Sequence, residues 1–189
     1  MLKREFILIA MAAAILSSCS GTRSYLNPEA DMGFYHRVGV AAFVSLTDDP
    51  RAGQKLQRVF MTELLKHQDF DIVPAGQFEK VENDVRAKQS IAATSGLDSA
   101  AIQLIGDQTG AQGIITGVVR DFRMERVGQD EFPLVSFSLQ LVDVKSGRVV
   151  WDVSMGERGG PKFPVLSFGE THTLSELSAK LCQRALRTL

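Results

Sequence analysis

The segment from 135 to 153 constrains the fold more than any other part of this sequence of 189 residues. Its first half alternates apolar and polar residues, the apolar set being Val135, Phe137, Leu139 and Leu141. A period of two is typical of a strand with one buried face. Residues 145–147, Lys-Ser-Gly, then predict a turn, and the alternation resumes over 149–153. The pattern predicts a β-hairpin whose single apolar face packs against another layer.

The remaining periodic segments predict that layer. Residues 38–44 are apolar, as in a strand covered on both faces. Helical spacing of apolar residues predicts helices at 50–67, 76–88, 99–110 and 173–189. Further strands are expected at 70–74 and between 111 and 125. The order β-α-β-α-α-β-β-β-α indicates a single α/β (α+β) domain, with one mixed sheet of about five strands and helices packed on it.

Local signals mark the helix ends. Asp49 before Pro50 predicts the start of the first helix, and Asp98 or Ser99 can cap the third. Thr173 begins the capping box of the last helix, and Gly110 is placed to end the third helix in a left-handed conformation. The helix at 76–88 is expected at the surface, with Glu82 and Arg86 among its charged residues.

The first 18 residues have the pattern of an export signal. Lys3 and Arg4 precede the apolar run 6–16. A helix of that length spans about 16 Å, which is too short for a hydrocarbon core of about 30 Å. We therefore expect a signal peptide rather than a membrane span.

The end of this segment, Leu-Ser-Ser-Cys at 16–19, resembles the bacterial lipoprotein box. The resemblance implies cleavage before Cys19 and a diacylglyceryl group on its thiol. It also implies that the new amino-terminal amine carries an acyl chain such as palmitate. The alternative is an ordinary signal peptide that contains a cysteine. Ser20 fits an outer-membrane destination, because Asp at that position is the usual retention signal in the resembled class.

Three segments follow from this. Residues 1–18 are the signal peptide, 19–36 a lipidated tether and 37–189 a periplasmic α/β domain. An acylated Cys19 leaves Cys182 unpaired, and its helical surroundings favour a small, inert core residue over a reactive thiol.

Residues with catalytic or metal-binding spacing are missing from the sequence. His36, His67 and His172 are far apart, and none stands at metal-ligand spacing. The sequence has neither a phosphate loop nor a nucleophile elbow. We therefore expect no enzyme activity, metal or cofactor, although two carboxylates meeting in space stay an open alternative. A formal net charge of -1 also disfavours nucleic acid as a partner.

A loop near the carboxyl end is the best candidate for an interaction surface. It is expected within 156–171, which is rich in Gly and Pro, and its apolar side chains are Phe163, Val165, Leu166 and Phe168. Exposed apolar loops usually need a partner, and the alternative is a loop folded onto its own core. Trp151 is a further candidate contact, as an exposed platform, if it is not a core residue of the sheet. Residues 120–131 are expected to be a charged hairpin tip or an adaptable rim.

Several of these segments together resemble a known superfamily. They are VGVAAF at 38–43, FDIVPAGQFEKV at 70–81, GAQGIITGVVRDF at 110–122 and LQLVDVKSGRVVWD at 139–152. The resemblance is to the envelope lipoproteins that include the curli secretion channel and the penicillin-binding-protein activator. The amino-terminal domain of the Tol propeller protein is similar in fold.

This resemblance implies a lipid-anchored outer-membrane protein that faces the periplasm, with the cell surface as the alternative. Its domain would be non-enzymatic and would bind an envelope partner, as accessory or activator of a cell-wall synthase or secretion apparatus. The first alternative is a homo-oligomeric channel of the curli type. Residues 123–134 are too charged and 155–171 too rich in Gly and Pro for the two membrane hairpins that such a channel needs. The second alternative is a cell-wall-active enzyme.

Overall fold

A computed structural model describes residues 22–66, 69–92, 94–160 and 171–189. Its centre is one mixed sheet of seven strands in the order β1-β7-β6-β5-β2-β4, with β3 paired to β5. The strands are β1 (Arg23–Leu26), β2 (Arg37–Val40), β3 (Val44–Ser45), β4 (Asp71–Ile72), β5 (Gly113–Val127), β6 (Asp130–Asp143) and β7 (Val149–Arg158). The helices are the short 3-10 helix η1 (Met32–Phe34), α2 (Ala52–Leu64), α3 (Ala75–Gln89), α4 (Ser99–Thr109) and α5 (Leu174–Leu186).

The α+β class and the single mixed sheet are confirmed, whereas the expected count of about five strands is too low. One reason is that the apolar run 38–44 divides into β2 and β3. Between the two strands, side chains from the neighbouring helices bind the backbone. Gln57 Nε2 donates to the Ala41 carbonyl at 3.0 Å, and the Ala42 amide donates to Glu82 Oε2 at 3.0 Å.

The second reason is β1, which lies inside the expected tether of residues 19–36. It pairs antiparallel with β7, with Arg23 opposite Ser154 and Leu26 opposite Trp151. All four of its residues are exposed, so their sequence shows none of the alternation that one buried face produces. The folded part of the chain therefore starts at least 14 residues earlier than expected, and backbone pairing rather than burial holds β1.

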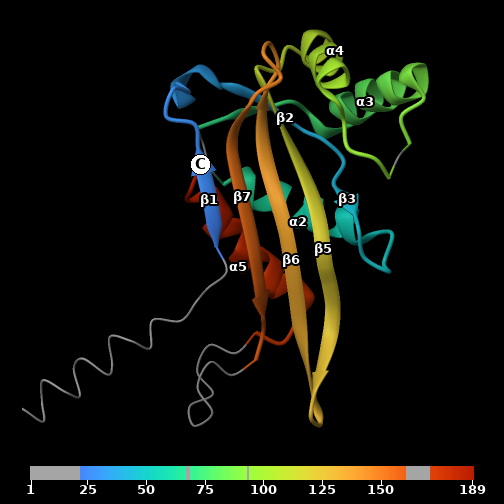
Figure 1. Ribbon diagram of the computed structural model, residues 1–189, viewed down its shortest axis with the longest axis vertical. Coiled ribbons are helices and arrows are strands. Elements are labelled where there is room, and N and C mark those ends of the chain that lie inside the picture. The colour runs from blue at the N-terminus through green and yellow to red at the C-terminus, as the bar shows by residue number, and fades with distance from the viewer. Residues whose placement is uncertain (1–21, 67–68, 93, 161–170) are drawn as a thin grey trace, which may run out of the picture.

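Helices cover the two faces of the sheet unequally (Figure 1). Helices α2 and α5 pack on one face, in a core cluster that includes Phe60, Phe137 and Leu181. Helices α3 and α4 cover only one end of the other face, in a second cluster around Phe78 and Ile105. No helix of the described residues packs on the rest of that face, which is mostly polar, as is common for antiparallel strands. Its polar residues include Thr116, Ser136, Ser138, Gln140, Asp152 and Ser154, which are partly exposed.

The long hairpins are built as their alternation predicts. Val135, Phe137, Leu139 and Leu141 are 0% exposed and face α2 and α5. Gly147 makes the turn between β6 and β7 with a φ of 67°. The charged segment 120–131 does form a hairpin tip, where β5 and β6 pair as far as Val127 and Asp130.

Three of the predicted helix ends are confirmed. Asp98 accepts a hydrogen bond from the Ala101 amide at 2.8 Å, and Thr173 Oγ1 accepts from the Glu176 amide at 3.2 Å. Gly110 ends α4 with a φ of 70°. The first helix differs, since it begins at Ala52 without a side-chain cap. Asp49 instead accepts from the Arg51 amide at 2.9 Å and closes the turn before the helix.

Tyr35, which precedes β2, contacts the β6–β7 turn through a titratable hydroxyl group. Its hydroxyl donates to Asp143 Oδ1 at 3.2 Å, while Asp143 Oδ2 accepts from the amide and hydroxyl of Ser146. Burial raises the pKa of Tyr35 from 10.0 to about 12, and the negative charge of Asp143 adds to this shift. Folding therefore holds the phenol proton more tightly than the unfolded chain does.

This raised pKa predicts a loss of stability in alkali. The contribution is complete below pH 10 and disappears as the pH rises from about 10 towards 12, because only the unfolded chain releases the proton in that range. Tyr35→Phe should flatten this fall. Urea denaturation followed by circular dichroism at a series of pH values would measure it, and an unchanged slope in the variant would contradict the assignment.

Candidate functional site

A hollow with a volume of about 640 Å³ lies between α2 and α3. We call it the α2–α3 groove. It opens at the carboxyl ends of the parallel strands β2 and β4, whose following helices pack on opposite faces of the sheet. A crevice at this kind of switch point is the usual ligand position in sheets with parallel strands.

The floor of the groove is apolar. It is formed by Val40, Phe43, Val73 and Phe78, all of which are buried. Met61 and Leu65 extend this surface along the α2 side, and Leu65 is 64% exposed at the mouth. An exposed apolar side chain that continues an apolar floor is a feature of protein contact sites.

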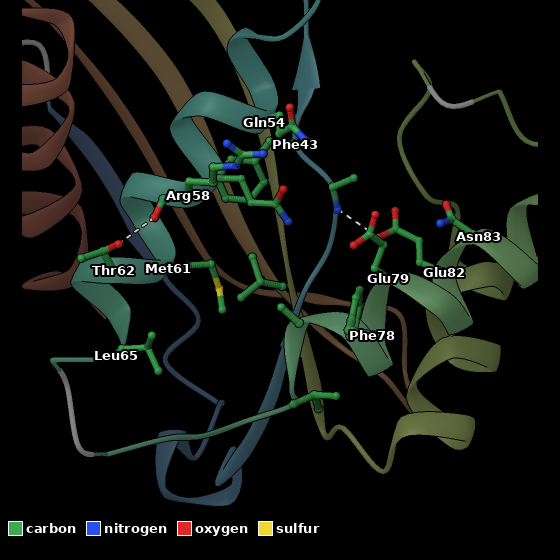
Figure 2. Close-up of a pocket in the computed structure, with 15 residues that line it drawn as sticks. Phe43, Gln54, Arg58, Met61, Thr62, Leu65, Phe78, Glu79, Glu82 and Asn83 are labelled. Atoms are coloured by element: carbon green, nitrogen blue, oxygen red, sulfur yellow. Dashed lines mark hydrogen bonds between the residues drawn. The ribbon is translucent and has the colours of Figure 1, made fainter.

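The two walls carry opposite charges (Figure 2). Helix α2 contributes Arg58 together with Gln54, and helix α3 contributes Glu79 together with Asn83. All four side chains are exposed. Thr62 Oγ1 donates to the backbone carbonyl of Arg58 at 3.0 Å, but among the described residues no ion pair or hydrogen bond engages the Arg58 guanidinium or the Glu79 carboxylate. The groove can therefore offer one positive and one negative group to a ligand without breaking an internal contact.

Glu82 also lines the groove, but its carboxylate is already engaged. Oε2 accepts from the Ala42 amide at 3.0 Å and Oε1 accepts from Arg86 Nε at 2.9 Å. Arg86 in turn donates to the carbonyls of Ala92 and Ser95. The expectation that α3 keeps Glu82 and Arg86 on a solvated surface is wrong, because the segment after α3 folds back over both, and they are 3% and 7% exposed.

The sequence-based candidates are placed differently from this groove. Cys19 and the loop residues Phe163, Val165, Leu166 and Phe168 lie outside the described residues. Trp151 is 0% exposed and its Nε1 donates to Thr188 Oγ1 at 3.0 Å. It is therefore a core residue of the sheet that holds α5, and its candidacy as an exposed contact is wrong.

Cys182 is the core residue that its helical surroundings indicated. It is 0% exposed, and burial, with a smaller effect of the Glu63 charge, raises the pKa of its thiol to about 12. A thiol that keeps its proton is a poor nucleophile.

Two further features are missing from the described residues. No group of three His, Cys, Asp or Glu side chains is arranged to hold a metal ion there. Within the same residues, no helix is both long enough and apolar enough to cross a membrane.

Comparison with known families identifies the domain that carries the groove. Residues 53–154 match the family model described as peptidoglycan-synthase activator LpoB, which is more than half of the chain. The chain belongs to the LpoB family. The matched region contains α3 and nearly all of α2, hence both walls of the groove, whereas β1 and α5 lie outside it. This confirms the resemblance seen in the sequence to the penicillin-binding-protein activators.

Solved structures support the same fold for this LpoB-family chain. The dodecamer of PelC from Paraburkholderia phytofirmans is similar with a TM-score of 0.60 and 21% identity, over 89% of this chain and 96% of that one. Lipoprotein GNA1162 from Neisseria meningitidis is similar with a TM-score of 0.54 and 13% identity, over 80% and 98%. No curated protein sequence matches the chain.

The groove is a candidate site that the sequence patterns did not reveal. One available signal was Leu65, an apolar residue that follows directly on Leu64 of the buried stripe of α2. The two walls are contributed by separate helices, so their opposition across one floor depends on the packing of both helices against the sheet.

Proposed function

We propose that this protein is a lipid-anchored accessory protein of cell-envelope assembly, which acts by binding a peptidoglycan synthase rather than by catalysis. The observation that carries the proposal is the LpoB family match over 53–154. In this proposal Cys19 holds the protein in the outer membrane, and the domain faces the periplasm.

The α2–α3 groove is the proposed contact surface for the synthase. Its chemistry fits a partner segment that presents an apolar side chain to the floor beside Phe43 and Phe78. An acidic group on that segment would pair with Arg58 and a basic group with Glu79. Charges of opposite sign on the two walls fix the direction of such a segment, because the reverse orientation would bring like charges together.

Anchoring is tested first by Cys19→Ala. We expect the wild-type protein in the membrane fraction, with a mature amino terminus whose mass includes the acyl groups, because several acyl chains give stable attachment. The variant should be soluble after export and equally folded by circular dichroism. An unmodified wild-type amino terminus would contradict lipid anchoring.

Groove binding is tested with purified peptidoglycan synthases of the source organism. Arg58→Glu should weaken binding at least about tenfold, or about 1.4 kcal/mol, because it places like charge against the partner's acidic group. Arg148→Glu is the matched control, since Arg148 is an exposed arginine in the β6–β7 turn, outside the groove. Titration calorimetry and the rate of glycan polymerisation are the measurements.

Equal affinities of Arg58→Glu and Arg148→Glu for the synthase would exclude the groove as the contact surface. If the wild-type protein stimulates no synthase, the activator role is excluded. Release of fragments from peptidoglycan incubated with this protein alone would favour the alternative of a cell-wall-active enzyme.

A second candidate function is a subunit of a homo-oligomeric assembly in envelope secretion. It is supported by the similarity to PelC, which is a dodecamer in its solved structure. Light scattering of the detergent-solubilised lipoprotein would distinguish the two functions. A ring of fixed subunit number favours this candidate, and a monomer that stimulates a synthase favours the first.

A further inference from the structure

The described chain enters β1 from the side of the molecule towards which the β5–β6 hairpin projects (Figure 1). Strand β1 runs antiparallel to β7, with Arg23 opposite Ser154, so its amino-terminal end points along β7 towards Arg158. Thr22 continues in that direction, because its hydroxyl donates to Met155 Sδ at 3.3 Å. The segment between Cys19 and the domain is thus attached beside Met155.

The hairpin extends well beyond this attachment point. Met155 pairs with Phe137, whereas the last pair of the hairpin joins Val127 to Asp130. Asp130 lies seven residue steps before Phe137 on β6, which at about 3.3 Å per step is about 23 Å. The tip of the hairpin therefore lies about 23 Å further along the strand direction than Thr22.

The link to the anchor is shorter than this overhang. Three residue steps join Cys19 to Thr22 and can span at most about 11 Å. A diacylglyceryl group on Cys19 would hold the cysteine at the headgroup layer, which is about 5–8 Å thick on each side of the bilayer. A hairpin pointing straight at the membrane would then place its tip about 12 Å deeper than the cysteine.

The side chains of the tip suit the headgroup layer better than the hydrocarbon. Met124 and Val127 are 41% and 40% exposed, so their apolar surface gains from contact with the interface. Arg126, Asp130 and Glu131 carry charges of both signs that are costly in hydrocarbon. Mixed charges can pair with the phosphate and the amine of a zwitterionic headgroup, which lie close together.

We propose that the short link holds the tip of the β5–β6 hairpin, residues 124–131, in the headgroup layer of the anchoring membrane, with the hairpin leaning towards the membrane plane. This rests on the lipid anchor of the proposed function. It gives the domain a defined orientation, in which α3 and α4 lie at the end away from the membrane.

The test uses the lipidated full chain in vesicles of phosphatidylethanolamine with a minor share of phosphatidylglycerol. Spin labels are attached to Val127→Cys, to Tyr25→Cys and to the control Leu104→Cys, whose site is an exposed apolar position on α4. The native Cys182 is buried and does not compete for the label. Collision rates with oxygen and with a water-soluble nickel chelate report the depth of each label.

We expect the label at position 127 to be shielded from the nickel chelate at least about fivefold relative to the label at position 104. Inserting ten Gly and Ser residues after Ser20 adds about 33 Å of reach, so the shielding at position 127 should then disappear. The same protein is checked for acylation by mass and for flotation with the vesicles.

The experiment distinguishes failure of the lipid anchor from failure of the proposed hairpin orientation. A chain without acyl groups that does not float contradicts the anchor itself. An acylated, floating chain whose position 127 is as accessible as position 104 overturns the orientation, as does a label at position 25 in lipid while position 127 is in water. Shielding that survives the longer link would show that the link length is not its cause, and would also overturn the proposal.

Discussion

Glu82→Ala is expected to lower the free energy of unfolding by about 3–5 kcal/mol, because it leaves the charge of Arg86 buried without its partner. The two side chains are only 5% and 8% exposed, with Arg86 Nη2 2.8 Å from Glu82 Oε1. The variant also removes the acceptor of the Ala42 amide, which lies between β2 and β3. Denaturation in urea followed by circular dichroism gives the free energy.

The matched control is Glu176→Ala in α5. Glu176 also forms an ion pair with a residue four positions later, Lys180, but the two side chains are 46% and 45% exposed. Exposed pairs of this kind contribute at most about 1 kcal/mol. A Glu82→Ala loss no greater than the control loss would contradict the buried-charge argument. The double variant Glu82→Leu with Arg86→Met should recover part of the loss, because it removes both buried charges.

The separate variant Trp151→Ala is expected to lower the free energy of unfolding by about 3–5 kcal/mol, since it empties a fully buried site between β7 and α5. Its indole also donates to Thr188 Oγ1, so Thr188→Val should cost about 1 kcal/mol by leaving that donor unsatisfied. Tyr25→Ala is the control, because Tyr25 lies on the adjacent strand β1 and is 51% exposed.

The same residue gives the protein an optical probe. Trp151 is the single tryptophan of the chain. Its emission should lie at short wavelength in the folded protein and shift to long wavelength on unfolding. Emission typical of a water-exposed indole in the native state, or a Trp151→Ala cost equal to that of Tyr25→Ala, would contradict its burial.

Elements with a strong period were predictable in this protein. Val135 to Leu141 alternate because one face of β6 meets α2 and α5, and the four helices repeat apolar residues at their buried faces. The helix ends were also predictable, because each cap bonds to backbone only a few residues away. These caps are Asp98, Thr173 and Gly110. The prediction of Asp49 as the cap was wrong by two residues, because the N-cap of α2 is Arg51 and the Asp49 side chain closes the preceding turn instead.

Elements held by distant backbone or by a covering loop were not predictable. Strand β1 is exposed at each residue and is defined by its ladder with β7, about 130 residues away in sequence. The Glu82–Arg86 pair has the spacing of any helical surface pair, and only the carbonyls of Ala92 and Ser95 show that it is covered.

The sequence by itself determined the periodic framework, the residues that enter the core and the resemblance to the LpoB relatives, since each depends on spacing along one segment. Only the tertiary structure decided which surface is available for function. Arg58 and Glu79 line one groove because α2, which follows β3, and α3, which follows β4, pack on opposite faces of the sheet. The end from which the chain reaches its proposed anchor was decided in the same way, by the pairing of β1 with β7.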